Sequence, residues 1–80
     1  MLALTLISRR YCHLCTQMEA SLRSLVGTHP VEIHVLDVDA DPELEALYDE
    51  KVPVLLHGRT EVCHYHLDLP KVRDLLRKIR

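Results

Sequence analysis

The sequence contains no tryptophan or phenylalanine and only three tyrosines, so it has few of the side chains that dominate protein-binding hot spots. It also lacks an excess of either charge, because ten basic and twelve acidic residues give a formal net charge of -2. Without a strongly basic surface, electrostatic binding to nucleic acid or to a membrane is not favoured. We therefore expect neither nucleic acid nor membrane as a partner.

Cysteine is also scarce. Three cysteines are too few, and odd in number, for the disulfide framework on which small secreted domains depend. The apolar start of the chain, residues 1–7, is too short for the apolar part of a signal peptide, and Arg9 and Arg10 follow it instead of preceding it. We expect a cytoplasmic protein without a targeting or membrane-spanning segment.

The length and composition indicate one small globular domain. With 80 residues, of which 48% are hydrophobic and 28% charged, the chain can form a single hydrophobic core and is not of the disordered class. No internal repeat, linker or low-complexity stretch divides it. We expect one domain over residues 1–80 and a monomer.

The hydrophobic pattern predicts the element order β-α-β-α-β-β-α. Strands are predicted over 2–7, 31–38, 52–57 and 60–65, and helices over 13–26, 42–48 and 69–80. The first two strands are joined by a helix, so the handedness of such crossovers requires them to be parallel. The predicted fold class is α/β, with a four-stranded mixed sheet flanked by three helices.

Single residues add detail to this prediction. The continuous apolar first strand is typical of a strand buried on both faces. In the second strand, Val31, Ile33 and Val35 share one face, and the second helix is expected to direct Leu44, Leu47 and Tyr48 inward. Asp41 and Asp68 are suited to cap the second and third helices, each with a proline in the first turn, and Gly27 to end the first helix.

The segment Tyr11-Cys12-His13-Leu14-Cys15 carries the most specific chemical signal. Two cysteines three positions apart at the start of a helix can form a disulfide of normal geometry. The helix N-terminus and nearby Arg9 and Arg10 favour a thiolate, so Cys12 is the expected nucleophile. Cys15, one turn inside, would then resolve the mixed disulfide that Cys12 forms with a substrate.

Other interpretations of the cysteines remain open at this point. A zinc site could use Cys12 and Cys15 together with Cys63 and His66, although the last two would project to opposite faces of a strand. An iron–sulfur site could use the same Cys12 and Cys15. Cys63 alone is more typical of a small buried hydrophobe. His13 either lies beside the Cys12 sulfur or points into solvent.

With Cys12, Cys15 and Pro53 placed on the predicted element order, the chain resembles the glutaredoxin-like branch of the thioredoxin superfamily. It is most similar to short glutaredoxin-like proteins with a Cys-His-Leu-Cys site. The resemblance covers nearly the whole chain and is strongest over residues 5–15 and 51–55. It implies a thioredoxin-like fold and a thiol–disulfide oxidoreductase that uses Cys12 and Cys15, with no cofactor and no bound metal.

The resemblance also implies a substrate-binding region. It implies a cis peptide bond between Val52 and Pro53, whereas the sequence alone equally permits a simple proline at the start of a strand. The backbone of Val52 would pair with an extended thiol substrate, either a disulfide-containing protein or a glutathione-type thiol. The remaining substrate-binding residues implied by the resemblance are Tyr11, His13, Arg9, Arg10 and Asp68.

Two departures from related families limit what the resemblance implies. Glutaredoxins usually have a Gly-Gly turn before the last helix, where they bind the γ-glutamyl end of glutathione, and this chain has His64-Tyr65-His66-Leu67-Asp68. The chain also lacks the Trp-Cys-Gly-Pro-Cys sequence of thioredoxins. Glutathione is therefore a possible substrate only, and a redox-inactive binding module with this fold is a further alternative.

Overall fold

The computed structural model describes residues 2–78, and their elements follow the predicted order. The four strands are β1 (Leu2–Ser8), β2 (Val31–Asp37), β3 (Val54–His57) and β4 (Thr60–His64). The helices are α1 (His13–Val26), α2 (Pro42–Tyr48) and α3 (Leu69–Arg77), with a short 3₁₀ helix, η1, over Val38–Ala40. The predicted α/β class with three helices and a four-stranded mixed sheet is confirmed.

The strands form one sheet in the order β2-β1-β3-β4. As predicted from crossover handedness, β1 and β2 are parallel, with Leu4 opposite Ile33. Strand β3 is antiparallel to both β1 and β4. This topology places β1 and β3 at the centre of the sheet. The segment that carries the cysteines follows β1, and the proline precedes β3.

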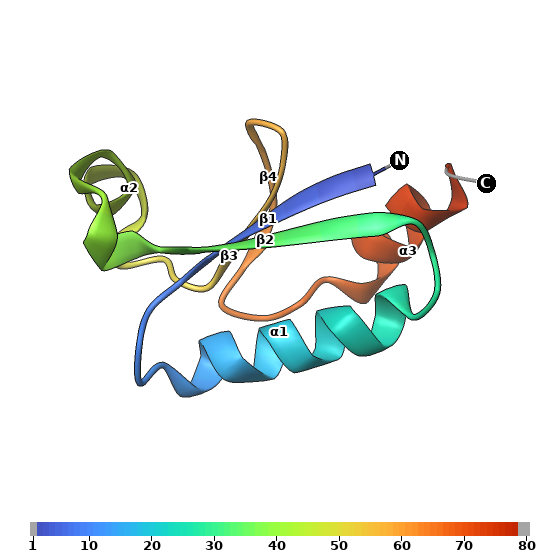
Figure 1. Cartoon of the computed structure of the whole chain (residues 1–80), viewed down its shortest axis with the longest axis horizontal. Coiled ribbons are helices and arrows are strands. Elements are labelled where there is room, and N and C mark those ends of the chain that lie inside the picture. The colour runs from blue at the N-terminus through green and yellow to red at the C-terminus, as the bar shows by residue number, and fades with distance from the viewer. Residues whose placement is uncertain (1, 79–80) are drawn as a thin grey trace.

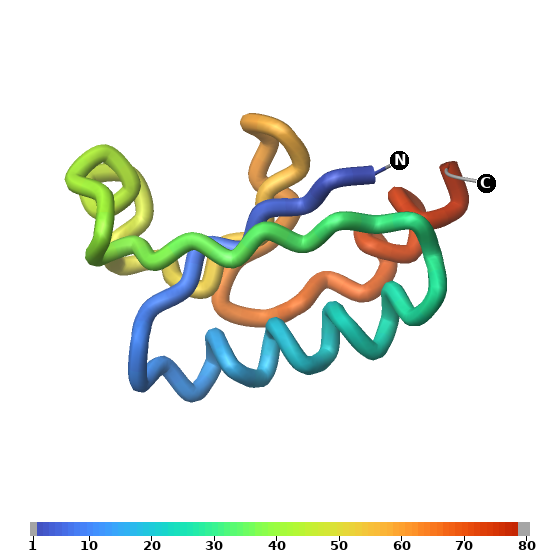
Figure 2. Tube along the Cα trace, viewed as in Figure 1, coloured from blue at the N-terminus to red at the C-terminus, as the bar shows by residue number. Residues whose placement is uncertain are grey.

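One face of the sheet is covered along its length by α1 and α3, and Figure 1 shows α1 running beside the strands. The apolar stripe of α1, including Met18 and Leu22, packs there with Leu4 of β1 and with Val72 of α3, all almost fully buried. The trace in Figure 2 shows how far α1 extends alongside β2. Burial of this face supplies most of the hydrophobic core.

The second face is covered at one end only. There η1 and α2 pack Val38, Leu44 and Tyr48 against Ile7 and Val54. In Figure 1 α2 lies at one end of the sheet, beyond the middle of the strands. A helix of seven residues is about 10 Å long, which is too short to cover a whole strand.

Two predictions of burial are corrected here. Strand β1 is not buried on both faces throughout, because Ala3 is exposed. The side chain of Leu47, predicted to point inward from the second helix, is 64% exposed. It lies outside the cluster that α2 packs against the sheet. Val35 shares the face of Val31 and Ile33 as predicted, but on the edge strand β2 its side chain is 41% exposed.

The ends of all four strands differ from the prediction, with β1 ending one residue later, at Ser8, and β2 one residue earlier, at Asp37. Strand β3 begins at Val54 instead of residue 52, because Val52 and Pro53 form a turn with a cis peptide bond. Strand β4 ends at His64, because Tyr65 has a φ of +63°, which no extended strand allows. The last helix ends at Arg77 with Lys78 as its C-cap, so residue 78 is not helical, contrary to the prediction, and the predicted continuation to residues 79 and 80 lies outside the described residues.

The helix caps are as predicted. Asp41 Oδ1 accepts a hydrogen bond from the Glu43 amide at 2.8 Å at the start of α2, and Asp68 Oδ1 accepts one from the Lys71 amide at 3.1 Å at the start of α3. Gly27 ends α1 with a φ of +55°, a conformation that favours glycine. No helix within residues 2–78 has the length and apolar character needed to span a bilayer.

Candidate active site

Cys12 and Cys15 lie at disulfide-bonding distance at the start of α1, with their Cα atoms 5.1 Å apart. Cys12 is the residue before the helix and is half-buried, whereas Cys15 lies in the first turn and is only 2% exposed. The difference in exposure matches the predicted division of roles. An incoming group can reach the sulfur of Cys12, and Cys15 is held behind it.

The sulfur of Cys12 is also the N-cap of α1. It accepts a hydrogen bond from the backbone amide of Cys15 at 3.1 Å. The first turn of the helix contains no acidic residue that would oppose a negative charge. An amide donor and the positive end of the helix dipole therefore meet at this sulfur, and both stabilise a thiolate relative to a thiol.

The residues next to Cys12 are exposed. Tyr11 has a φ of +57° and a fully exposed side chain, so it forms part of the outer surface around Cys12. His13 is exposed, and its Nε2 atom lies 3.1 Å from Nε2 of Gln17, one turn further along α1. Of the two positions considered for His13, this contact favours the solvent-facing one.

Arg9, in the loop before Cys12, binds Asp39 and Asp49. Its Nε and Nη2 atoms donate to the two carboxylate oxygens of Asp39, both at 2.9 Å. Its guanidinium also donates to the Asp49 carbonyl oxygen at 3.2 Å and to the Asp49 carboxylate. Hydrogen bonding to Asp39 and then to Asp49 raises the pKa of Arg9, and Arg9 lowers the pKa of Asp39. The charge of Arg9 is thus balanced by two carboxylates, whereas Arg10 is exposed.

Val52 and Pro53 form the turn that precedes β3, and the peptide bond between them is cis. Pro53 is fully buried, and Val52 is half-buried against the cluster around Ile7. The Lys51 amide donates to the Tyr48 carbonyl at 2.8 Å, and the Pro53 carbonyl accepts from the Tyr65 amide at 2.9 Å. Among the backbone hydrogen bonds of residues 2–78, none involves Val52, so its amide and carbonyl can pair with another chain.

Asp68 and Cys63 lie together at the junction of β4 and α3. The Asp68 carboxylate is the N-cap of α3. Cys63 is partly buried against the main core cluster, as expected for a small hydrophobe. Burial raises the pKa of the Cys63 thiol above its ordinary value. A thiol of this kind is a poor nucleophile at neutral pH.

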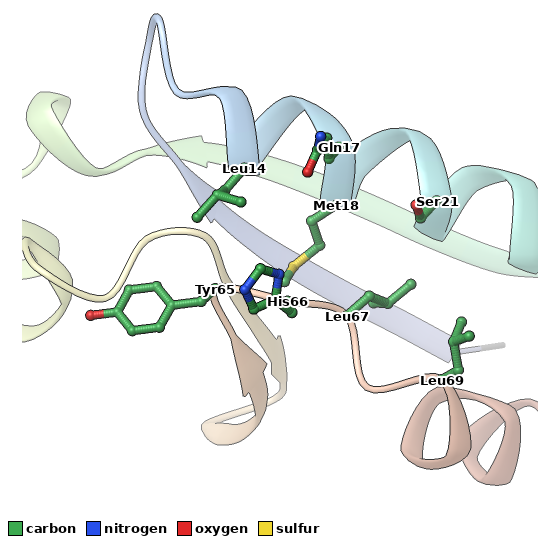
Figure 3. A pocket seen from close by; sticks show the side chains of 8 residues that line it. All are labelled: Leu14, Gln17, Met18, Ser21, Tyr65, His66, Leu67 and Leu69. Atoms are coloured by element: carbon green, nitrogen blue, oxygen red, sulfur yellow. The ribbon is translucent and has the colours of Figure 1, made fainter.

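A groove of about 230 Å³ begins beside the cysteine turn at Leu14. It runs along α1 to Ser21 and is bounded on the other side by the residues that follow β4, as Figure 3 shows. In this view the Met18 side chain points from α1 toward His66. The groove is lined by Leu14, Gln17, Met18, Ser21, Tyr65, His66, Leu67 and Leu69.

Sequence reasoning did not select Gln17 or Tyr65 as functional residues, and it considered His66 only as a zinc ligand. Gln17 carries no motif, and its contact with His13 depends on the helical turn between them. The signal for Tyr65 and His66 as groove residues was their position where the resemblance expects a Gly-Gly turn. The φ of +63° at Tyr65 shows that the chain adopts a glycine-like backbone there without a glycine.

The four residues considered as zinc ligands are not brought together. Within residues 2–78, no three side chains of His, Cys, Asp or Glu lie close enough to share a metal ion. Cys63 is in β4 and contacts the core, and His66 lies beyond the end of that strand on the rim of the groove. The geometry therefore supports the pairing of Cys12 with Cys15 alone.

Comparisons with solved structures show what this arrangement is similar to. Protein Ne2328 from Nitrosomonas europaea is 37% identical, with a TM-score of 0.80 over 92% of this chain and 89% of that one. Target protein XcR50 from X. campestris is 28% identical, with a TM-score of 0.68 over 96% of this chain and 99% of the other. Thioredoxin 1 from Thermosipho africanus, at 16% identity and a TM-score of 0.64 over 95% and 96% of the two chains, shares the fold.

A search of curated proteins gave no significant match. The sequence profile of the glutaredoxin-like domain family (DUF836), in contrast, matches residues 3–77, which is almost the whole chain. This match agrees with the thioredoxin-like sheet and with the cysteine pair at the start of α1. The chain belongs to the glutaredoxin-like domain family (DUF836) and has a thioredoxin-superfamily fold.

Proposed function

We propose that this chain is a thiol–disulfide oxidoreductase in which Cys12 is the nucleophile and Cys15 the resolving thiol. The observation that carries the proposal is the position of the Cys12 sulfur, which caps α1 and accepts the Cys15 amide at 3.1 Å. This environment favours a thiolate on the accessible cysteine of the pair. The second cysteine is buried one turn away, at a distance that allows a disulfide.

The proposed reaction has two exchange steps. The Cys12 thiolate attacks one sulfur of a substrate disulfide, a Cys12–substrate bond forms, and the other substrate sulfur leaves with the electron pair and takes up a proton. Cys15 then loses its proton and attacks the Cys12 sulfur, which releases the second substrate thiol. Two electrons pass from the dithiol to the substrate, and the protein is left with a Cys12–Cys15 disulfide. The reverse sequence oxidises a substrate dithiol.

The remaining residues of the site serve substrate binding in this proposal. The backbone of Val52 pairs with an extended segment next to the substrate disulfide, because its amide and carbonyl have no backbone partner within the described residues. Tyr11, His13 and Arg10 lie on the exposed surface around Cys12, where they contact that segment. The protein acts without a cofactor, as a monomer, and in the reducing environment of the cytoplasm.

We favour a protein disulfide over glutathione as the substrate. The resemblance gives Arg9 or Arg10 to the glycine carboxylate of glutathione, but here the Arg9 guanidinium is occupied by Asp39 and Asp49, which leaves Arg10 alone for that contact. Asp68 is engaged as a helix cap, and Tyr65 and His66 occupy the position of the glycines. A glutathione-type thiol then serves as the reductant that regenerates the Cys12–Cys15 dithiol.

The reduction potential of the cysteine pair tests the proposal. Metal-free protein is equilibrated with glutathione buffers, and free thiols are counted by mass after alkylation. A reversible two-electron transition within the range of known oxidoreductases, roughly -120 to -270 mV, supports exchange chemistry. Thiols that stay reduced at every buffer ratio contradict it, and metal bound near one equivalent in protein purified without chelator favours a metal or iron–sulfur site instead.

A further inference from the structure

Tyr65 holds the segment that contains Val52 at both of its ends. Its hydroxyl donates a hydrogen bond to the Glu50 carbonyl at 2.6 Å, and its backbone amide donates to the Pro53 carbonyl at 2.9 Å. In Figure 3 the tyrosine ring extends away from the groove, toward the segment between α2 and β3. One residue after β4 thus spans the four positions from Glu50 to Pro53.

The backbone of Tyr65 is in an unusual conformation that directs its side chain this way. Its φ is +63°, and the His66 amide donates to the His64 carbonyl at 2.7 Å, so Tyr65 is the central residue of a tight three-residue turn. A bulky residue in this region costs free energy that glycine would not. The Tyr65 side chain provides a hydrogen bond to the Glu50 carbonyl and an edge-to-face contact with the His64 ring, whose centroid lies 4.7 Å away.

The same segment is held from the other side by Arg9. The Arg9 guanidinium binds both the carbonyl and the carboxylate of Asp49, the residue before Glu50. Arg9 lies in the loop between β1 and α1, whereas Tyr65 directly follows β4. Between these two anchors, neither the amide nor the carbonyl of Val52 has a backbone hydrogen bond within residues 2–78.

We propose that Tyr65 is a positioning residue that fixes the Val52 backbone for pairing with polypeptide substrates and so favours protein disulfides over small ones. This inference rests on the proposed function. Backbone pairing requires donor and acceptor atoms within a few tenths of an ångström of their best separation, and it orients the substrate sulfur toward Cys12. A small disulfide without amide groups gains nothing from this pairing.

The test compares two disulfides in single-turnover reactions of the fully reduced protein, without a regenerating reductant. One substrate is a peptide with a disulfide within an extended segment, and the other is 2-hydroxyethyl disulfide. The Tyr65→Phe variant loses the hydroxyl and keeps the ring and the backbone amide. We expect its rate constant for the peptide to fall about three- to tenfold, as for the loss of one hydrogen bond, and that for the small disulfide to stay within about 1.5-fold.

Two further variants separate the hydroxyl from other effects. Tyr48→Phe removes a tyrosine hydroxyl from α2 and should leave both rate constants unchanged. Tyr65→Gly adopts the positive φ without strain but lacks the side chain, so its peptide rate should fall at least as far as that of Tyr65→Phe. A full peptide rate in Tyr65→Gly would show that the backbone conformation, and not the hydroxyl, positions Val52, and would overturn the proposal.

The outcomes distinguish this inference from the proposed function. Equal rate constants in wild type and Tyr65→Phe, or an equal fall for both disulfides, would refute the role of Tyr65 and leave the redox activity standing. A wild-type protein that reacts with neither disulfide would refute the proposed function itself. A selective loss of the peptide reaction in Tyr65→Phe, together with an unaltered Tyr48→Phe variant, would support both.

Discussion

Arg9 and Asp39 form a two-point ion pair that joins the loop before Cys12 to the turn after β2, with Nε–Oδ2 and Nη2–Oδ1 distances of 2.9 Å. The two residues are 30 positions apart in the sequence. Asp39 lies in η1, next to the buried Val38 that anchors this end of the second sheet face. The pair therefore couples the position of the loop before Cys12 to the packing of η1.

The first prediction concerns the pH dependence of this pair. In the folded state, hydrogen bonding to Arg9 lowers the pKa of Asp39 below its ordinary value of 3.8. The pair therefore stabilises the fold fully above about pH 4, and this contribution is lost as the pH falls through the folded-state pKa. We expect wild type to melt at a higher temperature than Asp39→Asn near pH 6, and the difference to shrink toward pH 2.5.

A second variant serves as the control for that measurement. In an Arg9→Gln background, Asp39 has lost its partner, so Asp39→Asn should no longer change the pH dependence of the melting temperature. Added salt should reduce the wild-type effect, because both side chains are partly exposed to solvent. A melting difference that is the same at pH 2.5 and pH 6 would contradict the assigned role of the ion pair.

The second prediction separates the roles of the two active-site cysteines. Cys12→Ser should abolish disulfide exchange, because it removes the accessible thiolate. Cys15→Ser should still attack a substrate but accumulate a mixed disulfide, visible by intact mass, because no resolving thiol is present. Cys63→Ser is the matched control and should turn over normally, since Cys63 lies in β4 against the core. Full turnover in both Cys12→Ser and Cys15→Ser would rule out the mechanism.

The third prediction uses alkylation rates to compare Cys12 with Cys63 in the Cys15→Ser variant. The helix N-terminus should shift the pH midpoint for alkylation of Cys12 below the value of about 8.5 for a free thiol. Burial raises the pKa of Cys63, so its alkylation should be slow at neutral pH and rise only at more alkaline pH. Mass spectrometry of the digested protein distinguishes the two sites. Cys12 and Cys63 reacting with the same midpoint would argue against a stabilised thiolate at Cys12.

The fourth prediction concerns Asp68, which both caps α3 and is a candidate for substrate binding. Asp68→Ala should lower the free energy of unfolding by about 0.5–2 kcal/mol in urea denaturation, because the Lys71 amide loses its acceptor. Asp68→Asn keeps a capping oxygen and should be close to wild type in stability. If the Asp68 charge contacts glutathione, Asp68→Asn should slow regeneration by glutathione without lowering the stability of the fold. An unchanged rate would assign Asp68 to helix capping only.

Much of the architecture could be predicted from local patterns. The stripe of Leu14, Met18, Leu22 and Val26 specified α1, and Asp41 and Asp68 marked the starts of α2 and α3. These signals depend on residues within one or two turns of each other, so the sequence contains them directly. The same is true of the cysteine pair, whose spacing at a helix start already indicated a disulfide.

The burial of single side chains was less predictable. Leu47 and Val35 follow apolar patterns, yet both are exposed, Leu47 because it lies outside the cluster that α2 packs against the sheet and Val35 because it lies on the edge strand β2. Periodicity shows which residues share a face of an element. Whether another element covers that face depends on helix length and position in the folded chain.

The sequence by itself determined the element order, the helix caps and the cysteine pair, because each of these follows from neighbouring residues. Only the tertiary structure decided that Arg9 binds Asp39 and Asp49, and that Tyr65 reaches the carbonyl of Glu50. These partners are 15 to 40 positions apart, and no local rule relates them. They meet because the sheet order β2-β1-β3-β4 brings the loop before α1, the end of α2 and the turn after β4 to one region. Hydrogen bonds of this kind depend on atomic positions that are set only when the whole core packs.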